Sequence, residues 1–175
     1  MHSAQDDNHL KKRLANLRKN FSPAFVENEE TNLLKMRQEM LHLIKDFEPD
    51  MILEECGPYR VTPGDTWKAE TGSEYTILEK TYPQKHLFVD AKLLKSGEKP
   101  LAEKREKEIS NSTKKVLKKL GVNKIVLIIG SSHLENVEKL LKAKDLSIRF
   151  KDLKAKFFGN IKELLEKEKK LKSAQ

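Results

Sequence analysis

The chain has 175 residues, of which 37% are hydrophobic and 35% charged, enough to bury one core beneath a heavily charged surface. No apolar run approaches the ~20 residues of a membrane span, and the polar N-terminus is unlike a signal peptide. The single cysteine, Cys56, excludes an internal disulfide framework and suits the reducing cytoplasm. The net charge is +8, but the lysines alternate with glutamates in helical runs, as on solvated helix faces. Aromatic residues make up 6% of the chain and are not interleaved with the basic runs, as stacking on bases would require. Nucleic acid is therefore not an expected partner.

Two helices are expected in the first 50 residues. Residues 1–18 are polar, with leucines at helical spacing, and the break comes at 20–23. A second helix over 29–47 places five large apolar residues on one face and ends before Pro49. The residues that should face inward are Leu10, Leu14 and Leu17 in the first helix, and Leu33, Met36, Met40, Ile44 and Phe47 in the second.

Short apolar segments then alternate with helices. A short strand followed by a turn is expected at 50–57, and further strands at 86–90 and 124–129, with a weaker fourth at 146–150. Helices are expected at 67–80, 101–120, 134–143 and 161–171; the second of these has Ile109, Val116, Leu117 and Leu120 inward and ends at Gly121. The pattern predicts an α/β fold with a mainly parallel sheet of about four strands flanked by helices. We expect one domain over 1–175, with 1–20 and 172–175 peripheral or frayed.

Polar residues stand at the ends of three of the expected strands. Glu54 and Glu55 end the first, Asp90 ends the second, and His133 follows the third after Gly-Ser-Ser. In open α/β sheets ligands bind beyond the C-terminal strand ends, so a carboxylate and an imidazole there would allow metal ligation or acid–base chemistry. Arg105, early in the next helix, could hold an anionic oxygen.

Each of these residues also has an ordinary structural interpretation. The Gly-Ser-Ser-His segment could be a tight turn with a serine N-cap, Asp90 a turn residue, and Arg105 a surface residue. Because side chains alternate along a strand, Glu54 and Glu55 must point in opposite directions. One of the two could then form an ion pair while the other serves a function.

The same residues resemble a known superfamily. Glu54 followed by Cys56 and Arg60, the pair Arg105–Glu106, and the strand 125–129 that closes in Gly-Ser-Ser-His resemble, in the same order, motifs of the TraB/PrgY, Tiki, ChaN and erythromycin-esterase-like proteins. The resemblance covers roughly residues 29–141. The chain has Glu106 where the family has Asp and one more residue than expected between Cys56 and Arg60. The family's first strand, which ends in an earlier Gly-x-x-His, is expected to be truncated or missing here, with His2 where that histidine belongs.

The resemblance implies a metal-dependent or His/Glu-assisted hydrolase that acts on a small molecule or a peptide. His2, Glu54 and His133 would be the ligands of a divalent metal ion. Glu54, Arg105 and His133 would be the catalytic residues, with Arg105 neutralising developing negative charge. Without the first strand the site could instead be degenerate, or a second copy of the chain could supply the strand in a homo-oligomer.

Two other functions remain open at this point. The chain could be a non-enzymatic module that binds a ligand in the same cleft, or an acidic partner or nucleic acid on its lysine-rich helices. It could also be an interaction protein, such as a secreted bacterial effector.

Overall fold

The computed structural model describes residues 7–55, 77–89, 101–142, 151–158 and 166. Its sheet has three parallel strands in the order β2-β1-β3: β1 (Met51–Glu54) in the centre, β2 (His86–Phe88) and β3 (Ile125–Ile128) beside it. The register pairs Ile52 with His86 on one side and with Val126 on the other. The α/β class and the parallel sheet are confirmed, while the expected fourth strand at 146–150 lies outside the described residues.

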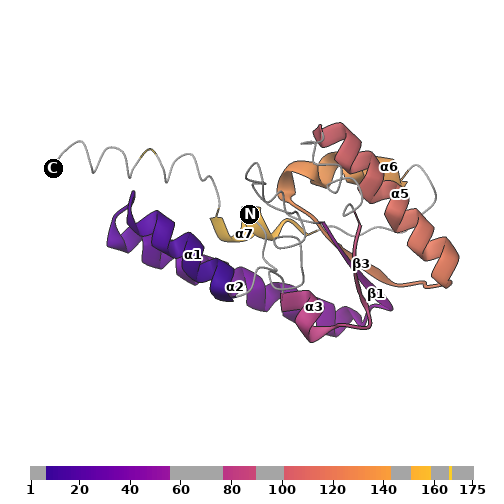
Figure 1. Ribbon diagram of the computed structural model, residues 1–175, viewed down its shortest axis with the longest axis horizontal. Helices are drawn as coiled ribbons and strands as arrows, with labels where there is room; N and C mark the ends of the chain where they lie inside the picture. The colour runs from indigo at the N-terminus through magenta and orange to yellow at the C-terminus, as the bar shows by residue number, and fades with distance from the viewer. Residues whose placement is uncertain (1–6, 56–76, 90–100, 143–150, 159–165, 167–175) are drawn as a thin grey trace, which may run out of the picture.

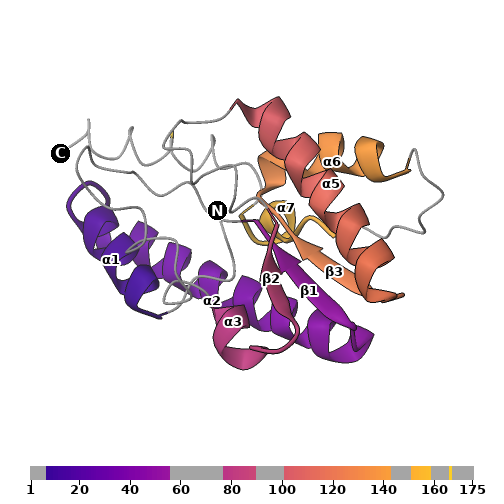
Figure 2. The same cartoon turned by 45° about the vertical axis from the view of Figure 1, so that its right-hand side comes forward.

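Helices cover both faces of this sheet (Figures 1 and 2). On one face, α5 (Ala102–Leu120) and α6 (Leu134–Lys142) pack against β1 through a cluster that includes Leu53, Ile109 and Val137. On the other face, α2 (Pro23–Phe47) and α3 (Ile77–Thr81) pack against Ile52. The alternation of side chains along β1 therefore sends odd-numbered residues toward α5 and α6 and even-numbered residues toward α2 and α3.

A helical hairpin extends from the sheet. It consists of α1 (Asp7–Arg18) and α2, with the short helix α7 (Leu153–Phe158) alongside (Figure 1). Leu10 and Leu14 of α1 and Phe158 of α7 are buried against apolar residues of α2, so the leucine stripe expected in the first helix is confirmed. The part of the chain described here contains no helix that is both long and apolar enough to cross a bilayer.

The second helix starts six residues earlier than expected. Ser22 is its N-cap, with the hydroxyl accepting a hydrogen bond from the N–H of Phe25 at 3.3 Å, and Pro23 occupies the first turn, where its missing N–H costs nothing. At the other end Phe47 is 43% exposed, so its expected inward orientation is wrong. The ammonium group of Lys124 lies 5.6 Å from the centre of its ring.

The helix α5 follows the expected pattern over most of its length. Ile109 is fully buried and Gly121 ends the helix with φ of 61°, as the sequence predicted. Leu120 is 55% exposed, so its expected inward orientation is wrong. The helix α7 was not expected from the sequence, and of the terminal helix predicted at 161–171 only Glu166 is described, as helical.

Candidate functional site at the C-terminal edge of the sheet

Four charged side chains meet at the edge of the sheet where β1 and β3 end. Glu55 follows β1, Arg105 and Glu106 lie near the start of α5, and His133 closes the 3₁₀ helix η3 (Ser131–His133) that follows β3. Their side chains are buried, from 4% exposed for Glu55 to 11% for His133. We call these four residues the edge cluster.

Glu55 is bound at both of its carboxylate oxygens. Oε1 lies 2.7 Å from Nη2 of Arg105, and Oε2 accepts a hydrogen bond of 2.6 Å from the backbone N–H of Gly130. A Cβ at position 130 would lie 3.3 Å from that Oε2, so the glycine permits a close approach of the carboxylate to the backbone. Glu55 thus connects the end of β1 to the start of α5 and to the turn after β3.

His133 has a carboxylate facing each ring nitrogen. Nδ1 is 2.9 Å from Oε1 of Glu106, and Nε2 is 3.6 Å from Oε1 of Glu55. An ionised carboxylate only accepts hydrogen bonds, so this contact favours the tautomer of His133 that carries its proton on Nδ1. The second oxygen of Glu106 accepts a hydrogen bond of 3.0 Å from the side-chain amide of Asn136 in α6. The ring is therefore held by groups from α5 and α6 and directs Nε2 toward Glu55.

The location has a topological reason. The chain passes from β1 to α3 on one face of the sheet and from β3 to α6 on the other face. Neighbouring strands whose connections lead to opposite faces leave a crevice between their C-terminal ends, which is where open α/β sheets bind ligands. Glu55 and His133 follow β1 and β3 at this edge, with Nε2 of His133 3.6 Å from Oε1 of Glu55.

The structure separates Glu54 from this cluster. Glu54 points to the opposite face of β1, where its Oε2 lies 2.7 Å from Nε2 of His86, and both side chains are almost fully buried. The sequence predicted that Glu54 lies beside Arg105 and His133. This prediction is wrong, because Glu55 makes both contacts. Arg105 and His133 lie close to each other, as expected, and contact the same carboxylate. The N-cap of η3 is Gly130 rather than one of the two serines.

Several other sequence expectations fall outside the described residues. These are His2, Cys56, Arg60 and Asp90. Glu106 and Asn136 were not among the expected site residues. The spacing could have indicated them: Glu106 lies one helical turn before the buried Ile109, and Asn136 lies three residues after His133, on the same side of the chain.

A divalent metal ion does not fit the edge cluster as it stands. No group of three or more His, Cys, Asp or Glu side chains within the described ranges is arranged to hold a metal. Glu55 already binds Arg105 and Gly130, and Nδ1 of His133 is bound to Glu106. The second oxygen of Glu106 binds Asn136, so only Nε2 of His133 remains, fewer than the three protein ligands of a catalytic zinc site.

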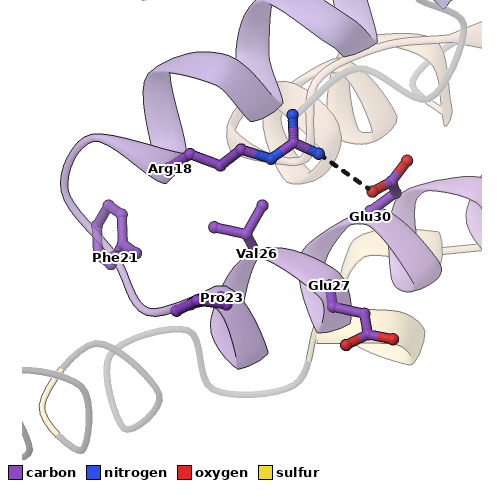
Figure 3. A pocket seen from close by; sticks show the side chains of 6 residues that line it. All are labelled: Arg18, Phe21, Pro23, Val26, Glu27 and Glu30. Carbon is purple, nitrogen blue, oxygen red and sulfur yellow. Dashed lines mark ion pairs between the residues drawn. The ribbon is translucent and has the colours of Figure 1, made fainter.

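A hollow lies at the end of the helical hairpin, around the turn between α1 and α2 (Figure 3). Phe21, Pro23 and Val26 form its apolar part, and Arg18 and Glu30 face each other across it at 3.9 Å. Its lining contains neither a nucleophile nor an imidazole. The hollow offers apolar surface and an ion pair but no group for catalysis.

Three lysines on the helices over the sheet are paired with glutamates. Lys107, Lys139 and Lys142 each form an ion pair with a glutamate four residues earlier. The hydrogen bond from Lys139 lowers the pKa of Glu135 below its usual value. These pairs fit the expectation of solvated helix faces.

Comparison of the chain with protein-family models, with curated protein sequences and with solved structures gave no match. The site is therefore interpreted from its own geometry.

Proposed function

We propose that the edge cluster is the acid–base centre of a hydrolase in which His133 transfers the proton. The supporting observation is that both ring nitrogens of His133 face carboxylates from different elements, beyond the C-terminal ends of β1 and β3. Glu106 holds the proton on Nδ1 and leaves Nε2 as the base for a water molecule or a hydroxyl group. This arrangement of an acid that orients an imidazole is common to many hydrolytic sites.

The other two members have roles that follow from their contacts. Arg105 binds Glu55 at 2.7 Å and brings a positive charge to the site, where it would stabilise an oxyanion that forms on the substrate. Glu55 keeps this guanidinium in place and lies 3.6 Å from Nε2, close enough to stabilise the imidazolium formed after proton transfer. His133 is the most exposed of the four, so the substrate would approach from its side.

The resemblance to TraB- and ChaN-like proteins agrees with this proposal in its order of Glu, Arg and Gly-x-x-His, but with Glu55 in the position that the sequence gave to Glu54. Its metal-dependent form needs ligands beyond the described residues, such as His2. The metal-free form needs only the side chains of the edge cluster. We therefore favour His/Glu-assisted hydrolysis of an ester or peptide bond.

The test is a hydrolysis screen with activated esters and short peptides, in the presence and absence of EDTA. His133→Ala and Glu55→Gln should lower kcat/KM at least about 100-fold, the usual contribution of a general base. His42→Ala is the matched control, because His42 lies on the exposed face of α2 and pairs only with Asp46 in the contacts seen. Equal rates for the wild-type protein and His133→Ala on every substrate would overturn the proposal and favour a binding module.

A further inference from the structure

We infer that Asn136 is a positioning residue for His133, acting through Glu106. This inference rests on the proposed function of His133 as a base. Asn136 belongs to the first turn of α6, and its side-chain amide donates a hydrogen bond of 3.0 Å to Oε2 of Glu106. The other oxygen of the same carboxylate contacts Nδ1 of His133 at 2.9 Å.

The contacts form a clamp on one carboxylate. His133 and Asn136 are three residues apart, so they lie on the same side of the chain and reach Glu106 together from across the gap between α6 and α5. With both oxygens bound, the carboxylate has one orientation. A carboxylate bound only by His133 could rotate about its terminal bond and would let the imidazole turn with it.

The chemical nature of Asn136 matters to the clamp. An amide donates to the carboxylate without adding charge, so the negative charge of Glu106 stays directed at the Nδ1 proton. An aspartate of the same shape would present only acceptor oxygens to Oε2 of Glu106 and would repel it. Second partners that fix a histidine-bound carboxylate commonly have large effects on the chemistry of the ring.

A space-filling role and a hydrogen-bond donor role of Asn136 predict different effects of Asn136→Asp and Asn136→Ala. If Asn136 only fills space, the isosteric Asn136→Asp should behave like the wild-type protein, and it should not destabilise α6, because an acidic residue in the first turn favours the helix dipole. If Asn136 acts as a donor, Asn136→Asp should disturb His133 at least as much as Asn136→Ala.

The experiment is NMR spectroscopy of the histidine side chains at about pH 8, where exposed carboxylates are ionised. The chain has 5 histidines, and His133→Gln identifies the signals of this ring. In the wild-type protein we expect the Nδ1–H tautomer and a protected Nδ1–H signal. In Asn136→Asp and Asn136→Ala we expect the exchange of that proton with water to be about tenfold faster or its signal to be lost, consistent with the loss of one charge-assisted hydrogen bond.

Asn111→Ala is the matched control, since Asn111 is an exposed asparagine on α5. It should leave the His133 signals unchanged. Wild-type signals in Asn136→Asp, with the fold intact by circular dichroism, would overturn the positioning role. A protein that lacks hydrolytic activity but shows the tenfold effect would overturn the proposed function alone, so the two failures are distinguishable.

Discussion

The ion pair between Glu55 and Arg105 should contribute strongly to stability, and a double-mutant cycle measures how much. Glu55 is 4% exposed and Arg105 7%, and their closest atoms are 2.7 Å apart. Breaking a buried pair by removal of one partner typically costs about 3–5 kcal/mol. Glu55→Gln keeps the volume and one acceptor oxygen, so we expect a loss near the lower end, about 3 kcal/mol.

The assay is urea unfolding followed by circular dichroism. With a denaturant slope of about 2 kcal/mol per M for a chain of this size, the midpoint should fall by about 1.5 M in Glu55→Gln. Arg105→Met should cause a similar loss, because it leaves the buried carboxylate without its guanidinium. The double variant should lose less than the sum of the two single losses, with a coupling of about 1.5 kcal/mol or more.

The control is the exposed pair formed by Glu103 and Lys107 on the same helix. Glu103→Gln removes an ion pair in open solvent and should leave the midpoint unchanged. If the losses of Glu55→Gln and Arg105→Met add to within about 0.5 kcal/mol, the two groups do not interact in the folded protein, and the geometry of the edge cluster would be refuted.

Three further predictions concern the rest of the fold. Ile109→Ala should cost about 2–5 kcal/mol in urea unfolding because Ile109 is fully buried, whereas Leu120→Ala, at an exposed site, should have little effect. Hydrogen bonds from two backbone N–H groups before β3 lower the pKa of Asp50. The stabilising effect of Asp50 is therefore present above the usual aspartate pKa and is lost as the pH falls, so the difference in urea midpoint between wild type and Asp50→Ala should shrink on acidification. Hydrogen bonds from Lys151, just before α7, and from Lys156, within α7, lower the pKa of Glu39 from 4.5 to about 2. The contribution of Glu39 is therefore complete above about pH 4.5 and lost toward pH 2, so the stability difference between wild type and Glu39→Gln should shrink over that interval, and a constant difference would contradict the contact.

Periodicity was sufficient to locate the main helices and strands. The spacing of Leu33, Met36, Met40 and Ile44 identified the buried face of α2, and the short apolar runs before Glu54 and Gly130 identified two strands of the sheet. Errors arose at helix ends, where periodicity says little. Phe47 and Leu120 continue the apolar pattern, but the elements that would cover them are absent at those positions among the described residues.

The helix α7 shows a different limit. It has only six residues, too few for a helical period to be recognised, and a helix of that length is not stable alone. Its position depends on Phe158, which is buried against α1 and α2, and on two ion pairs that Glu39 forms with Lys151 and Lys156. Such contacts join residues more than 100 positions apart, and no local pattern contains them.

The choice between Glu54 and Glu55 also required the tertiary fold. Strand alternation showed that the two carboxylates face opposite ways, but it did not show which face α5 covers. That follows from the order β2-β1-β3 and from the packing of Ile109 against Leu53, which puts Arg105 and Glu106 on the odd-numbered side of β1. Once that side is known, Glu55 is the carboxylate that can reach the start of α5.

Two adjacent glutamates thus have opposite environments, and each faces a histidine. Glu54 and His86 come from adjacent strands beneath α2 and α3, with side chains 0% and 1% exposed, so a substrate has no surface there to approach. A buried pair of this kind can often be replaced by apolar residues without loss of stability, which is the behaviour of a structural contact. Glu55 and His133 instead face each other at 3.6 Å beyond the C-terminal ends of β1 and β3, and His133 keeps part of its surface exposed. If the proposed function is right, Glu55→Gln should lower the rate of proton transfer by His133 in the folded protein, whereas Glu54→Gln should not. Comparing the rates of the two variants therefore distinguishes the structural glutamate from the one at the proposed site.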